Sequence, residues 1–188
     1  MTDEKVAVLD KNGVPSGEEK LKSAVHKEGL FHWSVHLWIY NTKEEILLQK
    51  RASTKNIFPG LWDMAAAGHV AAKESIEDAL DRELFEELGL KIERDKIKKI
   101  EVRKTGNVVP GWQHPHNEFV HVYLLRWDGN ANELIIQKSE VEKVTFIPLN
   151  KFEAELKDPK KSKKYVPHNQ YYFDIIKEIK NDLLQNHP

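Results

Sequence analysis

Residues 68–90 constrain this chain more than any other stretch. They read GHVAAKESIEDALDRELFEELGL and fit the spacing G-x5-E-x7-R-E-U-x-E-E-x-G-U, where U is a bulky aliphatic residue. At ordinary amino-acid frequencies, a pattern with so many single-residue positions does not arise by chance. The fixed positions are Gly68, Glu74, Arg82, Glu83, Leu84, Glu86, Glu87, Gly89 and Leu90.

The same stretch carries the signals of a helix. Ser75 is a good N-cap with Asp78 three residues later, and Gly89 suits the left-handed residue that ends a helix. We therefore expect a helix over residues 75–88. Its first half places apolar residues on the stripe that normally faces a core. The same stripe then continues into three carboxylates, those of Glu83, Glu86 and Glu87.

Three carboxylates on one helical stripe repel one another, so their negative charge needs a compensating positive charge. Like charges four residues apart cost about 0.2–0.5 kcal/mol per pair on an exposed helix, and more where they are desolvated. Hard divalent cations such as Mg²⁺ remove this repulsion, since they bind a few carboxylates together with phosphate oxygens. A solvated acidic face is the alternative interpretation. The register of Gly68, Glu74, Arg82 and Gly89 with the glutamates favours a metal site.

The stretch resembles a complete Nudix box, the signature of enzymes that cleave a diphosphate linked to some other group. This resemblance implies an α/β fold with a mixed β-sheet between helices, an α/β/α sandwich, in a single domain over residues 1–188. It also implies a small-molecule diphosphate substrate and Mg²⁺ or Mn²⁺ as the cofactor. The implied metal ligands are Glu83, Glu86, Glu87 and the backbone carbonyl of Gly68, where a glycine permits close approach.

The resemblance also implies roles in catalysis. In the family a water attacks one phosphorus, and metal ions activate that water and neutralise charge on the bridging oxygens. Arg82 would hold a carboxylate in place, with Glu74 as one candidate partner. The general base varies between members: it can be a box glutamate, here Glu83 or Glu86, or a carboxylate from a later loop. The later candidates, between which the sequence does not choose, are Glu118 and Glu140.

Segments outside the box resemble the branch of the superfamily that contains isopentenyl-diphosphate isomerase. The likeness rests on His32, WSVHLWIY and ILLQKRASTKNIFPGLWDMAAAGHV, and it spans most of residues 5–150. In the isomerases, histidines and acidic residues bind a structural divalent metal, which implies a second metal here. His116 replaces what is usually a glutamate of this set. The matching ligands are His26, His32, His69 and Glu118.

Substrate-binding residues can be carried over from the same branch. Its basic residues that clamp the diphosphate match Lys22, Arg51 and Lys55. Trp112 is a further candidate, on a rim of the substrate site, because aromatic side chains near a diphosphate can stack a base or pack an isoprenoid tail. Homodimers are common in the superfamily.

One departure from the isomerases bears on mechanism. The isomerase protonates its substrate with a cysteine just before the Gly-His pair, whereas Ala67 stands there and the chain has 0 cysteines. We therefore expect a hydrolase acting on a nucleotide-linked, isoprenoid or thiamine diphosphate. One alternative is an isomerase that uses another acid. Another is a non-catalytic diphosphate sensor, although sensors usually show a degraded box.

Composition and charge exclude some further classes of function. A formal net charge of −1, with 31% charged residues, argues against strong nonspecific nucleic-acid binding. The N-terminus has no signal-peptide pattern, and no apolar run approaches the roughly 18 residues of a membrane span. We therefore expect a cytoplasmic protein without membrane partners. A local run of basic residues is typical of a solvated loop. The run consists of Lys157, Lys160, Lys161, Lys163 and Lys164.

Periodicity and turn signals predict alternating strands and helices. The expected strands are residues 6–9, 33–40, 46–51, 64–70, 97–104, 118–127 and 141–147, with a turn at Asn12-Gly13. The expected helices are residues 18–26, 75–88 and 169–184. The last helix has an inward stripe formed by Tyr172, Ile175, Ile176, Ile179 and Leu183.

Overall fold

The structure is a computed structural model that describes residues 3–108 and 115–185. Contacts divide the chain into two compact units, each assembled from several segments. The first unit comprises Met1–His36, Ala67–Glu83 and Lys99–Tyr123, and the second comprises Leu37–Ala66, Leu84–Lys98 and Leu124–Pro188. The single domain expected from the sequence stays a prediction.

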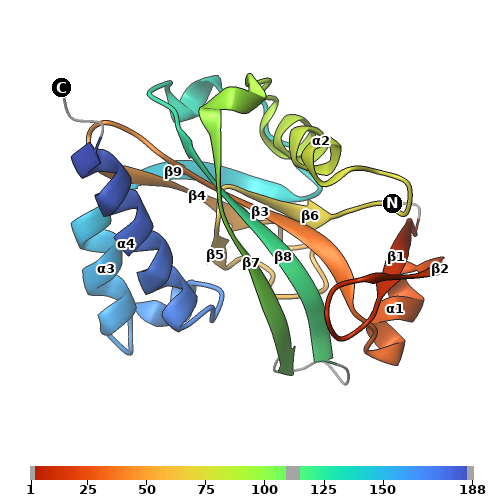
Figure 1. The fold of residues 1–188 in the computed structure, drawn as a ribbon. Helices are drawn as coiled ribbons and strands as arrows, with labels where there is room; N and C mark the ends of the chain where they lie inside the picture. Colours follow the sequence, from red (N-terminus) through yellow and green to blue (C-terminus); the bar gives the residue numbers. More distant parts are fainter. Residues whose placement is uncertain (1–2, 109–114, 186–188) are drawn as a thin grey trace. The chain divides into compact units, whose positions relative to one another are not determined.

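Runs of strands are separated by single helices along the chain, and two helices end it (Figure 1). The helices are α1 (Lys22–Glu28), α2 (Ile76–Leu88), α3 (Leu149–Lys157) and α4 (Gln170–Gln185), with short 3-10 helices η1 (Arg94–Lys96), η2 (Ala131–Glu133) and η3 (Ser162–Lys164). The strands are β1 (Lys5–Leu9), β2 (Pro15–Leu21), β3 (His32–Tyr40), β4 (Glu45–Arg51), β5 (Trp62–Asp63), β6 (Ala66–His69), β7 (Ile97–Val108), β8 (Pro115–Arg126) and β9 (Val141–Pro148). One sheet has the order β5-β4-β3-β8-β7, with β6 paired to β3 and β9 to β4, and β1 pairs with β2 in a second sheet.

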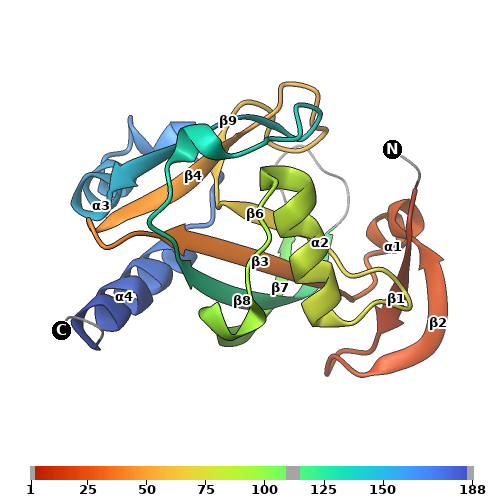
Figure 2. The same ribbon diagram turned by 90° about the horizontal axis from the view of Figure 1, so that it is seen from above.

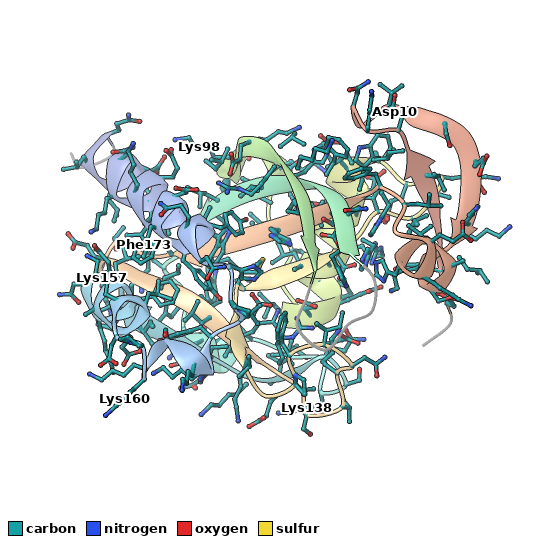
Figure 3. The ribbon with its side chains drawn as sticks, turned by 90° about the horizontal axis from the view of Figure 1, so that it is seen from below. Asp10, Lys98, Lys138, Lys157, Lys160 and Phe173 are labelled. Atoms are coloured by element: carbon teal, nitrogen blue, oxygen red, sulfur yellow. The ribbon has the colours of Figure 1, made fainter. Side chains whose placement is uncertain are left out.

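In the first unit, β1 and β2 form an antiparallel hairpin beside α1. The predicted turn at Asn12-Gly13 is confirmed, with Gly13 at a φ of 85°. The side chain of Asp10, labelled in Figure 3, fixes this turn by accepting hydrogen bonds from the amides of Asn12 at 2.8 Å and Val14 at 2.9 Å. Such local side-chain bonds are a usual reason for aspartate in turns.

The predicted helix over residues 18–26 is wrong in its first part. Residues up to Leu21 belong to β2, which pairs Leu21 with Lys5 and Lys20 with Val6. Helix α1 begins only at Lys22 and ends before Gly29, whose φ is 64°. The exposed sequence of β2 carries little apolar signal, so its state is decided by backbone pairing with β1.

The second unit is built around β4, which pairs antiparallel with β3, β5 and β9. Figure 2 shows β9 running alongside β4. The strand expected over residues 64–70 is shorter, because β5 ends at Asp63 and β6 begins at Ala66. Trp62 of β5 makes an isolated parallel bridge with Tyr165, which ties the chain ahead of α4 to this sheet.

Helices α3 and α4 lie side by side in the second unit (Figure 1). The predicted inward stripe of the last helix is confirmed, since all of its five side chains are buried. Trp38 packs edge-on against Tyr171 and Tyr172, with ring centroids 5.7 Å away in both cases. Helix α3 was not predicted; it is only nine residues long and follows β9 without a break. None of the helices within the described residues is both long and apolar enough to cross a membrane.

Candidate active site and metal centres

Helix α2 carries the acidic stripe predicted from the sequence. The hydroxyl of Ser75 accepts a hydrogen bond from the amide of Asp78 at 3.1 Å, as expected of an N-cap. Gly89 follows the helix with a φ of 68°. Within α2, Glu83 falls in the first unit, whereas Glu86 and Glu87 fall in the second.

In the first unit, Arg82 organises the carboxylates around it. Its Nε and Nη2 donate to the two oxygens of Glu74 at 2.8 and 2.9 Å, so the contact is bidentate. Its Nη1 donates to Glu83 Oε1 at 2.7 Å, and Nη2 also donates to the carbonyl of His69 at 2.9 Å. Burial acts to raise the pKa of Glu74, but the hydrogen bonds from Arg82 and Ala71 outweigh it and lower the pKa. Glu74 therefore stays ionised beside the guanidinium.

Gly68 lies where no side chain fits. A Cβ atom built on Gly68 would overlap the carboxylate of Glu83. The glycine of the box therefore lets the backbone of β6 approach this carboxylate closely. Carboxylate oxygens and a backbone carbonyl are the donors that Mg²⁺ and similar hard cations prefer, so the donor chemistry of these residues fits such an ion.

In the second unit, the two remaining box glutamates differ in burial. Glu86 is exposed, whereas Glu87 is 6% exposed and accepts a hydrogen bond from Gln49 Nε2 at 2.9 Å. Gln49 also donates to the carbonyl of Ala65 at 3.2 Å. We did not single out Gln49 in the sequence. The sequence could have pointed to Gln49 as a polar residue that directly follows the apolar run of β4. A buried amide at such a position needs a hydrogen-bond partner.

A second cluster in the first unit joins α1, β3, β6 and β8. Donor atoms of His26, His32, His69 and Glu118 all lie within 4.8 Å of one another. Nε2 of His26 is 3.2 Å from Nε2 of His32, and Glu118 Oε1 is 3.6 Å from His32 Nε2 and 3.5 Å from His69 Nε2. His116 also faces Glu118, with Nδ1 at 3.4 Å. The structure thus brings together every residue predicted for the second metal.

Electrostatics in this cluster suit a cation. Burial first, and then the neighbouring histidines, lower the pKa of His26 to about 3. Burial also lowers the pKa of His69, so both rings are neutral near pH 7 and offer lone pairs. Among the described residues, the buried Nε2 of His69 has no hydrogen-bond partner. Imidazole nitrogens with one carboxylate are a usual donor set for Zn²⁺ and Mn²⁺, so these residues fit a divalent ion.

Glu118 is held by its surroundings as an anion. Burial acts to raise its pKa, but the neighbouring imidazoles of His116, His32 and His69 outweigh burial and lower the pKa well below the usual value. Ser34 donates to its second oxygen, Oε2, at 3.0 Å. The role of Ser34 was also not anticipated, because 84 residues separate it from Glu118.

The predicted diphosphate clamp residues each contact a carboxylate. In the first unit, Lys22 Nζ is 2.9 Å from Glu4 Oε1. In the second unit, Arg51 Nη1 is 3.2 Å from Asp63 Oδ2, and the ammonium of Lys55 pairs with Glu140. The remaining substrate-binding candidate, Trp112, lies outside the described residues.

Comparison with known proteins decides the family. A family model described as NUDIX domain matches residues 30–168. The chain belongs to the Nudix family. The predicted enzyme class, a Nudix hydrolase, and the predicted α/β Nudix fold with a mixed sheet are therefore confirmed. The matched residues include the whole stretch 68–90.

Relatives of this Nudix chain include hydrolases and isomerases. It is 36% identical over 186 residues to Nudix hydrolase 3 of Arabidopsis thaliana, covering 95% of this chain but only 24% of that protein. It is 32% identical over 152 residues to isopentenyl-diphosphate Delta-isomerase 2 of Photorhabdus laumondii, covering 81% of each chain. The resemblance to the isomerase-containing branch is thereby confirmed.

Solved structures share the Nudix fold at low identity. DR0079 from Deinococcus radiodurans superimposes with a TM-score of 0.64 at 19% identity, over 93% of this chain and 98% of that chain. The NUDIX domain of NrtR from Shewanella oneidensis, which was crystallised with ADP ribose, gives a TM-score of 0.57 at 18% identity. This match covers 80% of this chain and 87% of that chain.

Proposed function

We propose that this Nudix hydrolase uses Mg²⁺ or Mn²⁺ to cleave the diphosphate linkage of a nucleoside-diphosphate-type or other diphosphate metabolite. The observation that carries the proposal is the guanidinium of Arg82, which donates two hydrogen bonds to Glu74 and a third to Glu83. Gly68 adds to it, since its missing side chain lets the backbone approach the Glu83 carboxylate. An arginine held this rigidly orients a carboxylate for a specific task.

Each box residue has a role in this proposal. Glu83, Glu86 and Glu87, which follow one another on α2, would hold the ion together with the carbonyl of Gly68. A bound divalent ion supplies charge neutralisation on phosphate oxygens and a water of lowered pKa. Gln49 orients the buried carboxylate of Glu87 through its amide.

The later carboxylates take different roles in the proposal. Nitrogens of His116, His32 and His69 lie 3.4, 3.6 and 3.5 Å from Glu118 Oε1, so we assign Glu118 to the histidine cluster as a ligand of a second, structural divalent ion. His26, His32 and His69 would supply the other ligands. The candidates for the general base are then a box glutamate or Glu140, whose carboxylate is 8% exposed.

Two named ligands of relatives guide the choice of substrates. ADP ribose is bound by the NrtR domain, and isopentenyl diphosphate is the named substrate of the Photorhabdus relative. Lys55 and Arg51 are the proposed contacts of this chain with the diphosphate. Ala67 stands where the isomerases use a cysteine, which argues for hydrolysis over isomerisation. The expected cytoplasmic location and homodimer stay predictions.

Product formation is the direct test: inorganic phosphate or diphosphate from isopentenyl diphosphate and thiamine diphosphate, and AMP with ribose phosphate from ADP-ribose. ADP-ribose, isopentenyl diphosphate and thiamine diphosphate are incubated with the protein in Mg²⁺, in Mn²⁺ and in EDTA. We expect turnover of at least one compound that requires the metal. Glu86→Gln and Glu87→Gln should each lower kcat by at least about 10²-fold, the scale for loss of a general base or of a main charge stabiliser. Their thermal stability should be retained, because each change removes a like charge from the helix.

Glu77→Gln is the matched control, since Glu77 is exposed in the first turn of the same helix. It should keep wild-type kcat. Equal losses of melting temperature and activity in the box variants would mean that the glutamates are structural. Metal-dependent binding of one compound without turnover would support a sensor, and proton exchange into isopentenyl diphosphate would support an isomerase.

A further inference from the structure

An ion pair in the second unit joins the ends of two neighbouring strands. Lys55 lies shortly after β4, and Glu140 directly precedes β9, the antiparallel partner in which Val141 opposes Arg51. The ammonium of Lys55 contacts Glu140 Oε2. The amide of Ala52 also donates to the carbonyl of Glu140 at 2.8 Å. The backbones that carry the pair are therefore fixed by the sheet.

The turn that carries Glu140 is also tied to the end of the box helix. The amide of Gln137 donates to the carbonyl of Glu87 at 3.2 Å, and the amide of Glu140 donates to the carbonyl of Gln137 at 2.9 Å. Lys138, labelled in Figure 3, marks this turn. Glu140 is thus held by a short hydrogen-bonded turn next to a glutamate of the box.

The two partners differ in their access to solvent. Glu140 is 8% exposed, and among the described residues its Oε1 is buried with no hydrogen-bond partner. The side chain of Lys55 is 27% exposed. A ligand can therefore reach the lysine, whereas the carboxylate depends on the lysine for neutralisation.

The second clamp cation of this unit is held much more firmly. Arg51 donates to Asp63 at 3.2 Å and to the carbonyl of Ile57 at 3.1 Å. Asp63 in turn contacts His168 Nε2 at 2.9 Å and accepts from the amide of Met64 at 2.9 Å. This network fixes Arg51 in place, while the contact between Lys55 and Glu140 can exchange one partner for another.

We propose that the diphosphate of the substrate displaces Glu140 from Lys55, so that Glu140 acts as an internal competitor for the diphosphate site. The inference rests on the hydrolase function proposed above. The carboxylate of Glu140 is released only when a diphosphate occupies Lys55.

Charge explains why the exchange proceeds. A diphosphate carries several oxygens with more than one negative charge, so it offers Lys55 a stronger charge-assisted contact than one carboxylate does. Each bound substrate must first break the existing pair. Glu140 therefore lowers the affinity of the protein for diphosphate, and this effect can be measured.

Binding of methylenediphosphonate, a diphosphate analogue whose carbon bridge cannot be hydrolysed, tests the exchange by calorimetry in Mg²⁺. We expect Glu140→Gln to bind this probe roughly 5- to 10-fold more tightly, because Lys55 no longer has a carboxylate partner. Lys55→Met should bind it more weakly. In the double variant the gain from Glu140→Gln should vanish, whereas simple relief of repulsion would persist without the lysine.

Lys50 of β4 and Glu142 of β9 provide a matched control pair, on the two strands whose ends precede Lys55 and follow Glu140. Their ion pair has an Nζ–Oε1 distance of 2.8 Å, with side chains 29% and 44% exposed. Glu142→Gln should change probe affinity by less than 2-fold, about the scale of a surface pair. Thermal melting checks each fold, and Glu140→Asp replaces Glu140→Gln if the latter melts early. The shortened side chain of the aspartate should also loosen the contact and tighten probe binding.

Unchanged or weaker probe binding by Glu140→Gln would overturn the exchange, as would a gain that survives in the double variant. These readouts do not depend on turnover. If the protein hydrolyses a substrate yet Glu140→Gln binds the probe like the wild type, the exchange fails alone. If the affinity pattern holds but no compound is hydrolysed, the proposed function fails while the exchange of partners at Lys55 stands.

Discussion

Gly68 is a position of the box that tolerates no side chain. Because a Cβ at this position would overlap the Glu83 carboxylate, Gly68→Ala must displace that side chain or the backbone of β6. Overpacking of this kind costs about 1–3 kcal/mol, and a misplaced catalytic group can cost roughly 10²-fold in rate. We expect kcat to fall by about that factor, measured on the best substrate of the panel.

The matched control is Gly106→Ala in β7. A Cβ there would meet Asn117 Oδ1 at 3.3 Å, which a small shift can relieve. This variant should keep its activity within a factor of about 2, since it leaves the box untouched. Full activity in Gly68→Ala would show that the close approach to Glu83 is dispensable and would weaken the assignment of Glu83 as a ligand.

Single residues were predictable from the sequence where the signal is local. The box fixes Arg82 and Glu74 only eight residues apart, and their bidentate contact is present. The partners of buried carboxylates were not predictable in this way. Gln49 reaches Glu87 from 38 residues away, and Ser34 reaches Glu118 from 84 residues away. Periodicity describes one segment at a time and contains no information on such long-range contacts.

Strand β5 depends on a charged network that makes its stability sensitive to acid. Burial acts to raise the pKa of Asp63, but the charge and hydrogen bond of His168, and then Arg51, outweigh burial and hold the pKa at about 2. The unfolded chain binds this proton more readily, with a pKa of 3.8. The stabilisation is therefore present above pH 4 and is lost as the pH falls through about 2, by about 2 kcal/mol.

Denaturant unfolding of Asp63→Asn and of the wild type at several pH values measures the contribution of the ionised Asp63 to the free energy of unfolding. The stability difference between the two proteins should be greatest near pH 6 and shrink towards pH 2. Asp95→Asn, at an exposed position in η1, removes the same charge and should show no such trend. A constant difference for Asp63→Asn across this range would contradict the assigned pKa.

Elements were predictable where apolar periodicity is strong. Helix α4 and its inward stripe match the sequence, since Ile175, Ile176 and Ile179 recur at helical spacing and are buried. Strand β2 and helix α3 escaped prediction for different reasons. Nearly every residue of β2 is exposed, so only pairing with β1 defines it. Helix α3 is too short for its period to stand out from the adjoining strand β9.

The histidine cluster connects segments that are far apart in the whole sequence. His26, His32, His69 and Glu118 come from four different elements, yet their donor atoms converge within 4.8 Å in the first unit. Chain entropy opposes such a convergence of distant segments, and a bound ion that prefers the folded state offsets this cost. Metal at this cluster should therefore act on global stability.

We expect Zn²⁺, which imidazole ligands favour, to raise the melting temperature and chelation to lower it again. At 100 times the dissociation constant the gain is about 2.7 kcal/mol, or roughly 5–10 °C for a chain of this size. His69→Gln should abolish the shift, because it removes one ligand whose side chain is only 20% exposed. Glu86→Gln, which alters the box alone, should keep the shift. A shift that disappears in Glu86→Gln but persists in His69→Gln would place the stabilising ion at the box instead.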